Sequence, residues 1–516
     1  MRCMRHNAGR PSFCAERFER SRRMDQTRRM VAQSLIAALV SQAFPAAASG
    51  KVSTGLPPVP DDGYDVRKAG AVGDGLADDT TALREACKIA GASASVLIPA
   101  QMTCLVTGSI IDASLAAHAV GQTWHGGGKI ITKSGCNFDV FDCRGVTDVT
   151  VRGLRAECGR LGAPYSSATA RFMAAKSRGH RCKLVSCHVT GFQSAVQFHD
   201  SAGCCAMGNT IESPIGWGID VQTGADDALV IANQVSGVAA AAITGISRAN
   251  PAVLTTSVPH GYSTGDQVIV RDVVGMSGIN GKTSLITVLT PTAFQMNSVD
   301  SSGYVAYARG GRVRSRLLEH GIYAAGSNRR SIRAPIIEKN RVTLCGTDGI
   351  KTSYCDDSRL AGNTVWENGG QGIYLTIGTN RADVGGNESW SNVENGILVY
   401  DGVTVSDSNR VHDNVVRGNG RSGISVRSSG AGMVTRAWIH GNVVDGNDRE
   451  ASGSQDGIVL TGANTMGAQV NHNKIRHQAT GVVIGSDVVA AVVEGNEFAD
   501  CTTDVADGGT RTSIRK

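Results

Sequence analysis

The side chains best able to do chemistry lie beside one recurring motif, a Gly followed by an aliphatic residue. The motif recurs at Gly349, Gly372, Gly396, Gly423, Gly457 and Gly481. Successive side chains of a strand point to opposite faces, so the residue after the aliphatic one points outward. The outward side chains that this alternation predicts are Gln197, His199, Asp220, Gln222, Tyr323, Lys351, Ser353, Tyr374, Thr376, Leu398, Tyr400, Ser425 and Arg427. Aromatic rings with a few fixed polar groups are typical of a sugar-binding groove.

One chemistry that fits this face is β-elimination from a uronate. It needs a base for the proton next to the carboxylate, and a positive group or Ca²⁺ to neutralise that carboxylate. Lys351, with Tyr323 and Tyr374 on the neighbouring strands, is the base or the neutralising group. Tyr374 or His199 is its predicted proton partner. The alternative is that Lys351 keeps a solvated strand face soluble and that the tyrosines only stack as β-formers.

The other chemistry is glycoside hydrolysis, which needs two carboxylates about 5 to 9.5 Å apart. Asp220 and Asp348 are the best pair, although Asp348 precedes a Gly and could form a turn, and Asp220 could dock the nearby insertion. His199, Tyr323, Tyr400 and Arg427 are predicted to bind substrate. Three weaker carboxylate candidates are Asp356, Asp357 and Asp401. The sequence has no GxSxG, HExxH or phosphate-loop motif, and no residue spacing predicts a metal site.

A second repeat interlocks with the first. An Asn followed by a β-former recurs at Asn340, Asn363, Asn387, Asn414, Asn442, Asn473 and Asn496, with gaps of 23 to 31 residues. A period of this length that holds short β-segments is typical of a parallel β-solenoid with one coil per repeat. The Asn column predicts a structural ladder at one corner of the coils. The chain's 64 Gly and 5% aromatic residues also suit an all-β solenoid with many tight turns.

The formal charge of the chain resides in its first 50 residues. They carry nine Arg and three acidic residues, a surplus of +6 that equals the net charge of the whole chain. The remaining residues are balanced, so charge gives no reason to expect nucleic acid as a partner. The basic start, the apolar run from Met30 to Phe44 and the small residues after it predict a secretory signal over residues 1–50.

Arg28-Arg29 within that segment also fits a twin-arginine signal, with Met24 or Met30 as the alternative start. The apolar run is too short for a stable membrane span. A linker over 51–64 follows, and we expect a secreted or periplasmic protein. Twelve of the 14 Cys lie after the signal. Cys182 and Cys204 could stack on adjacent coils, but the spacings assign no disulfide pairs, and burial as small apolar residues is the default expectation.

The first folded segment carries a family resemblance. The run from Asp65 to Ala86, including GAVGDGLADDTTALREA, predicts a strand and then a short capping helix that begins near Asp79 and closes at Gly91. It resembles the N-terminal signature of the pectin-lyase-like superfamily, in its rhamnogalacturonase/epimerase-like pectate lyase branch. The chain departs from that pattern at Gln101 and Cys104. The resemblance implies a right-handed parallel β-helix that acts on or binds polysaccharide.

A second resemblance covers residues 243–313, where the Asn repeat stops. Pro259-His260-Gly261-Tyr262 and Tyr307-Ala308-Arg309-Gly310-Gly311 resemble a small β-barrel of ubiquitin-activating enzymes and phage tail proteins. The resemblance places His260 in a turn. The predicted organisation is thus first coils over 65–242, a barrel over 243–313, further coils over 314–505 and a tail over 506–516.

The function expected from these observations is an exported polysaccharide-degrading enzyme. A β-eliminating lyase on acidic polysaccharide is favoured, mainly because the resemblance to the pectate lyase branch implies it, and also because the outward column is richer in Lys, Tyr and Arg than in paired carboxylates. A glycoside hydrolase, a C5-epimerase and a non-catalytic carbohydrate-binding or adhesion protein are the alternatives. The sugar, its linkage, the oligomeric state and a role for Ca²⁺ stay open.

Overall fold

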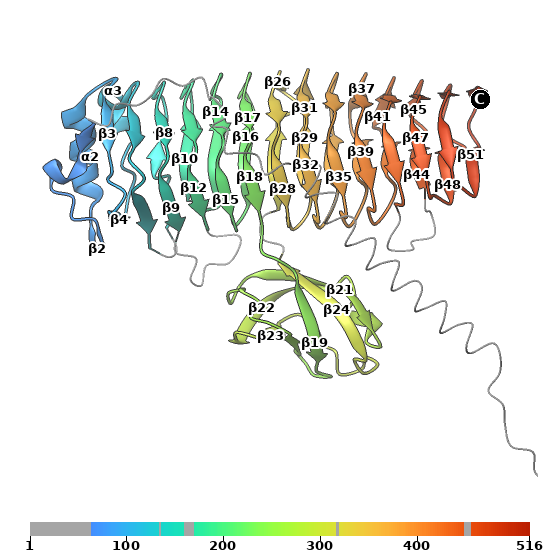
Figure 1. The fold of residues 1–516 in the computed structure, drawn as a ribbon, viewed down its shortest axis with the longest axis horizontal. Coiled ribbons are helices and arrows are strands. Elements are labelled where there is room, and N and C mark those ends of the chain that lie inside the picture. Colours follow the sequence, from blue (N-terminus) through green and yellow to red (C-terminus); the bar gives the residue numbers. More distant parts are fainter. Residues whose placement is uncertain (1–62, 134–135, 159–169, 316–318, 448–455, 516) are drawn as a thin grey trace, which may run out of the picture. The chain divides into compact units, whose positions relative to one another are not determined.

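A computed structural model describes residues 63–133, 136–158, 170–315, 319–447 and 456–515. The predicted signal and nearly all of the predicted linker lie outside these residues. The described chain forms a long parallel β-helix with one inserted closed barrel, which confirms the predicted all-β fold class (Figure 1). No helix among the described residues is long and apolar enough to cross a membrane.

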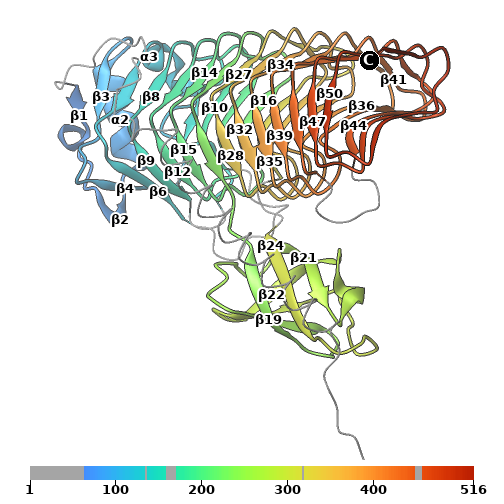
Figure 2. The same cartoon turned by 45° about the vertical axis from the view of Figure 1, so that its right-hand side comes forward.

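Three parallel sheets run along the β-helix, and each coil adds a strand to them (Figure 2). Sheet 1 carries the Gly-aliphatic motif and has 12 strands. Sheet 2 has 15 strands, from β1 (Tyr64–Asp65) to β52 (Ser513–Arg515), and sheet 3 has 14 strands, from β2 (Asp74–Asp78) to β50 (Glu497–Ala499). The strands of sheet 1 are β7 (Phe141–Asp142), β10 (Arg171–Lys176), β13 (Ser194–His199), β16 (Trp217–Gln222), β25 (His320–Ala325), β29 (Ile350–Ser353), β33 (Ile373–Thr376), β36 (Ile397–Asp401), β40 (Ile424–Ser428), β44 (Asp456–Thr461), β48 (Thr480–Ile484) and β51 (Thr503–Asp507).

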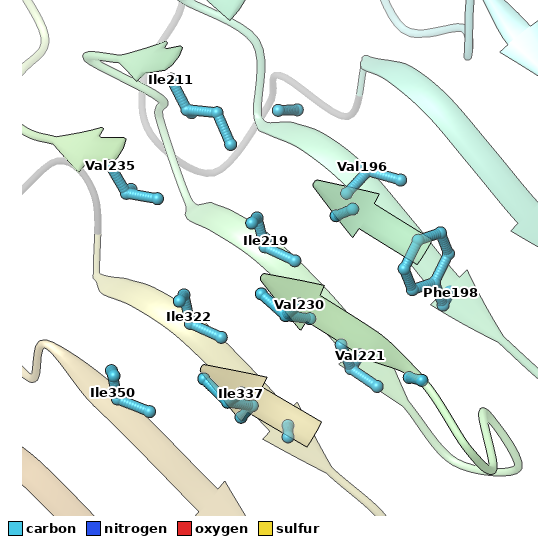
Figure 3. Close-up of a cluster of buried hydrophobic side chains, with 14 of the residues drawn as sticks. Val196, Phe198, Ile211, Ile219, Val221, Val230, Val235, Ile322, Ile337 and Ile350 are labelled. Carbon is cyan, nitrogen blue, oxygen red and sulfur yellow. The ribbon is translucent and has the colours of Figure 1, made fainter. Parts of the chain in front are cut away.

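Like residues stack on like residues along the interior of sheet 1. Ile219 pairs with Ile322 and Ile322 with Ile350, and none of the three is exposed. Figure 3 shows these side chains pointing into the interior from successive strands. The predicted alternation is therefore confirmed along these strands, because burying one face fixes the register. The alternation ends with β33: it would place Ile377 in the interior, but Ile377 follows the strand with φ of 33° and is partly exposed.

The Gly of each motif lies where sheet 1 and sheet 3 approach each other closely. A Cβ on Gly349 would overlap Cγ1 of Val365 and would lie 2.8 Å from the carbonyl oxygen of Gly372 on the next coil. Val365 belongs to β32 (Thr364–Trp366) of sheet 3. Glycine is thus required by packing at this position, since any side chain would push the two sheets apart.

The Asn column forms the predicted ladder. The backbone N–H and Nδ2 of Asn363 both donate to Oδ1 of Asn387, at 2.9 Å each, and Nδ2 also donates 2.8 Å to the carbonyl oxygen of Ile337. The side chain of each Asn therefore satisfies two buried backbone groups of the preceding coil, one N–H and one C=O. The ladder continues across the insertion, since the N–H of Asn233 donates 2.9 Å to Oδ1 of Asn340, 107 residues later. A second ladder, which the sequence analysis did not predict, links Asn368, Asn392, Asn419 and Asn447.

The predicted capping helix is α2 (Thr80–Ala90), which buries Leu83, Ala86 and Cys87 against the first coils. Asp78 supplies the cap, because its Oδ1 accepts the N–H of Thr80 at 3.0 Å. The carboxylate of Asp79 instead accepts the N–H groups of Val72 and Gly73, at 2.7 and 3.0 Å. It therefore ties the preceding loop to the start of the helix. The 3-10 helices η1 (Val66–Ala69), η2 (Ala113–Leu115) and η3 (Ser277–Ile279) and the short helix α3 (Ala116–Ala119) complete the described helices.

The barrel extends slightly beyond the predicted 243–313, because its first strand begins at Ala241 and its last ends at Ser315. His260 is buried in its core, where its ring stacks on Tyr262, 5.1 Å away, and contacts the edge of Phe294. The strands, in closed order, are β19 (Ala241–Ile246), β20 (Ala252–Thr256), β23 (Ala293–Met296), β22 (Thr283–Thr290), β21 (Gln267–Val274) and β24 (Arg309–Ser315).

Both ends of the β-helix differ from the predicted boundaries. The predicted tail, 506–516, was wrong, because β52 pairs in parallel with β49 (Val492–Glu494) and completes the last coil. At the other end, Tyr64 was assigned to the linker but begins β1, which pairs with β3 (Ser95–Leu97). Both segments form hydrogen-bonded strands on the neighbouring coil. The edge of a sheet offers unpaired backbone groups, so an adjacent segment can extend the sheet by one strand.

Candidate functional site

The register of sheet 1 aligns its outward side chains into three columns. The central column runs through Asp220, Tyr323, Lys351 and Tyr374, one residue from each of β16, β25, β29 and β33. The column two residues later contains Gln222, Ala325, Ser353, Thr376, Tyr400 and Arg427. The column before the motif contains Trp217 and His320, followed by Asp348 on the next coil. Successive coils lie about 4.8 Å apart, so neighbours in a column are within contact distance.

Lys351 lies between two tyrosines and beside a histidine. Its Nζ is 5.7 Å from the ring centre of Tyr323 and 5.2 Å from that of Tyr374, within the range of cation–π attraction. The same Nζ lies 3.5 Å from Nε2 of His320. Lys351, Tyr323, Tyr374 and His320 form what we call the Lys351 cluster. It joins a cation, two phenols and an imidazole on three adjacent coils.

The hydrogen bonds of His320 fix which of its nitrogens carries the proton. The hydroxyl of Thr347 donates to the carbonyl oxygen of Glu319, so it can only accept from Nδ1 of His320, 2.9 Å away. Nε2 is therefore the unprotonated nitrogen, and it faces Lys351. Burial, and next the charge of Lys351, hold the pKa of His320 well below its usual value, so the ring is neutral at neutral pH.

Asp220 and Asp348 are both buried, and each has its own partners. The amides of Gln197 and Gln222 donate to the two carboxylate oxygens of Asp220. Oδ1 of Asp348 accepts the N–H of Gln371 at 2.8 Å, and Oδ2 lies 3.4 Å from Nδ1 of His320. Burial raises the pKa of each carboxyl to about 6. The two lie in different columns and two coils, or about 10 Å, apart, so the structure does not bring them together as a facing pair.

The other predicted site residues fall along the same face. The ring of Tyr400 lies 6.5 Å from that of Tyr374, and the guanidinium of Arg427 lies 5.0 Å over the ring of Tyr400. At the other end, the ring of Trp217 stacks on Tyr323 with centres 5.8 Å apart. These residues form what we call the aromatic row: Trp217, Tyr323, Lys351, Tyr374, Tyr400 and Arg427. His199 is exposed on β13, three coils from Lys351, and lies outside the Lys351 cluster.

Sequence reasoning missed His320 and Trp217. Both occupy the position before the Gly of their motif, where Asp348 also lies. Strict alternation assigns this position to the interior, because it lies two residues before the inward aliphatic residue. Only the contacts of both rings with Tyr323, at 5.8 and 5.0 Å between ring centres, place them beside the outward side chains. Among the described residues, no group of three or more His, Cys, Asp or Glu side chains is placed to hold a metal ion.

The buried carboxyl of Asp220 predicts a specific pH dependence of stability. Its folded pKa of about 6 lies above the unfolded value of 3.8, so its contribution is fully present below about pH 4 and is lost as the pH rises through 6. We expect the stability of the wild type relative to Asp220→Asn to fall by up to about 3 kcal/mol between pH 4 and pH 7. Urea unfolding of both proteins at these two pH values measures the change. A difference that does not vary with pH would contradict it.

Comparison with known protein families identifies two regions. Residues 313–465 match the model described as the right handed beta helix region, and residues 249–316 match that of the ubiquitin-activating enzyme E1 FCCH domain. The ubiquitin-like modifier-activating enzyme 6 of Mus musculus is 37% identical over 71 residues, or 13% of this chain and 7% of that protein. The chain therefore spans only a small part of this curated relative.

Solved structures that are similar to this chain are distant from it in sequence. The catalytic unit of a thermostable α-1,3-glucanase from Streptomyces thermodiastaticus is 12% identical, with a TM-score of 0.52 over 88% of this chain and 69% of that one. The A-module of a mannuronan C-5 epimerase from Azotobacter vinelandii is 15% identical, with a TM-score of 0.49 over 87% and 99%. A surface adhesin of Streptococcus pneumoniae is 13% identical, with a TM-score of 0.46 over 87% and 93%. At such identities a likeness shows the fold alone.

Proposed function

We propose that this chain, a pectin-lyase-like right-handed β-helix protein, is an exported lyase that cleaves uronate-containing polysaccharide by β-elimination. The observation that carries the proposal is the Lys351 cluster, in which a cation and an unprotonated imidazole nitrogen lie 3.5 Å apart on the outer face of sheet 1. Elimination needs these two functions side by side, because the proton to be removed is next to the carboxylate to be neutralised.

Each residue of the cluster has a role in the proposed reaction. Lys351 pairs with the uronate carboxylate, which stabilises the negative charge that develops when the C5 proton leaves. Nε2 of His320 takes that proton, and the electrons of the C5–H bond form the C4–C5 double bond while the C4–O bond breaks. Tyr374 gives its phenol proton to the leaving oxygen. Burial raises the pKa of Tyr374 above its usual value, so the phenol keeps this proton at neutral pH.

The aromatic row supports binding of an extended chain of sugars. Its six side chains occupy six consecutive coils, from β16 to β40. Trp217 and Tyr400 would contact sugar rings on either side of the cluster. Arg427, held over Tyr400, would pair with a second carboxylate. A substrate with several uronates fits this order of aromatic and cationic groups.

Hydrolysis is the second candidate, because Asp220 and Asp348 have the raised pKa that a general acid needs. It is weaker, because Asp220 is fully buried and accepts two amide hydrogen bonds, and the two carboxyls lie two coils apart. A C5-epimerase would share the proton removal but return a proton to C5 without breaking the chain. An adhesin would bind the same polysaccharide without turnover.

One assay separates these activities. Purified protein is incubated with a panel of acidic polysaccharides, with and without Ca²⁺, while ultraviolet absorbance of unsaturated uronate and new reducing ends are followed. We expect absorbance and reducing ends to rise together. Reducing ends without absorbance would establish a hydrolase, and a changed uronate composition with neither signal would establish an epimerase. Retained binding without any of these changes would overturn the proposal in favour of an adhesin.

A further inference from the structure

Two cysteines lie side by side on adjacent coils of sheet 3. Thr132, the last residue of β6 (Lys129–Thr132), pairs with Cys158, the last residue of β9 (Arg155–Cys158). Cys136 lies four residues after the end of β6, and its Sγ is 3.1 Å from Oγ1 of Thr132 and 3.2 Å from Sγ of Cys158. We propose that Cys136 and Cys158 form a disulfide that links these two coils when the protein is in an oxidising compartment.

Cys143 and Cys182 form a second thiol contact, but this contact and burial hold the pKa of Cys143 well above its usual value. Most of the other cysteines are fully buried, and burial raises the pKa of Cys87 to about 11 and of Cys104 to about 12. Cys136 is half-buried, and its hydrogen bond with Cys158 lowers its pKa to about 7. The thiolate is the reactive form, so at neutral pH Cys136 is ready to react while the buried thiols are not. Cys501 is also partly exposed, but burial raises the pKa of its thiol.

The oxidation proceeds by thiol–disulfide exchange. The Cys136 thiolate attacks a sulfur of an external disulfide, such as glutathione disulfide or an oxidised thiol–disulfide oxidoreductase, and releases one thiolate of that oxidant. Cys158 then loses its proton and attacks the Cys136 sulfur, which releases the second oxidant thiolate. Two electrons pass to the oxidant, and the two protons of the protein thiols end on its reduced sulfurs.

The disulfide would link the start and the end of one coil. It would also restrain the segment between the two cysteines, which contacts sheet 1. The two cysteines are 22 residues apart, and the loop between them contains Asp139. The carboxylate of Asp139 holds Arg171 at 3.3 Å and Lys176 at 2.5 Å, both on β10 at the outward face of sheet 1. Closing a loop of this length restricts the unfolded chain, so the oxidised protein should unfold about 3 °C higher than the reduced protein.

The test uses the full chain and does not depend on its catalytic activity. Protein equilibrated with glutathione disulfide is denatured, alkylated with iodoacetamide and digested without reduction, and the peptides are identified by mass spectrometry. We expect one cross-linked pair that contains Cys136 and Cys158, with Cys501 alkylated. Alkylation of both Cys136 and Cys158, or a cross-link of either to another cysteine, would overturn the proposal.

Two serine variants supply the matched control. Thermal unfolding is compared with and without dithiothreitol for the wild type, Cys136→Ser and Cys501→Ser. The reductant should lower the midpoint of the wild type and of Cys501→Ser, and it should leave Cys136→Ser unchanged. If Cys136→Ser does not fold, the peptide result on the wild type still decides. If the reductant shifts the unfolding midpoint equally in all three proteins, other cysteines cause the shift, and the proposed disulfide between Cys136 and Cys158 is refuted.

Discussion

Replacing Lys351 by Met is expected to lower kcat/KM on the polyuronate by about 100- to 1000-fold. Met keeps most of the apolar stem between Tyr323 and Tyr374 but removes the charge that pairs with the uronate carboxylate. The loss should appear in kcat, because the negative charge on the substrate grows as the C5 proton leaves. The rate of absorbance increase at several substrate concentrations gives both constants.

Lys474→Met is the matched control for this variant. Lys474 is exposed on sheet 3, where its Nζ lies 3.4 Å from a carboxylate oxygen of Glu497. The same change there should leave the rate within about twofold, because exposed ion pairs contribute little. Both variants should keep the unfolding midpoint of the wild type within a few degrees. A Lys351→Met protein that folds and turns over at the wild-type rate would refute the proposed role of the cluster.

The largest expected effect on stability is that of Asn363→Leu, at about 3 to 5 kcal/mol. Asn363 donates to Asn387 and Ile337, and its Oδ1 accepts both the N–H and Nδ2 of Asn340, at 3.0 Å each. Leu would leave several of these buried groups without a partner. Urea unfolding followed by circular dichroism measures the change as a lower midpoint.

Asn496→Leu provides the comparison within the same ladder. Asn496 accepts from Asn473 but lies on the last coil of the ladder and is only partly buried. Water can therefore replace some of its lost hydrogen bonds, and the midpoint should fall by about half as much or less. Equal shifts for the two variants would show that burial along the ladder does not set the cost.

The sequence was sufficient for the features that repeat. Stacking every coil on the last makes Asn363 and Asn387 equivalent, so spacing alone revealed the ladder, and the Gly-aliphatic motif revealed which side chains of sheet 1 point outward. Features that occur on one coil only could not be predicted from the sequence. The protonation state of His320 follows from the hydroxyl of Thr347 and the charge of Lys351, and the partners of Asp220 come from two different coils. No repeat encodes such contacts.

The connection between two successive coils can be of almost any length. Asn233 and Asn340 meet as neighbours although a whole barrel lies between them in the sequence, and β16 pairs with β25 in the register used elsewhere. A coil needs only its own strands and its Asn to join the next one. Evolution can therefore add or exchange domains at such a connection, or lengthen the solenoid by whole coils, while the geometry of the Lys351 cluster stays fixed.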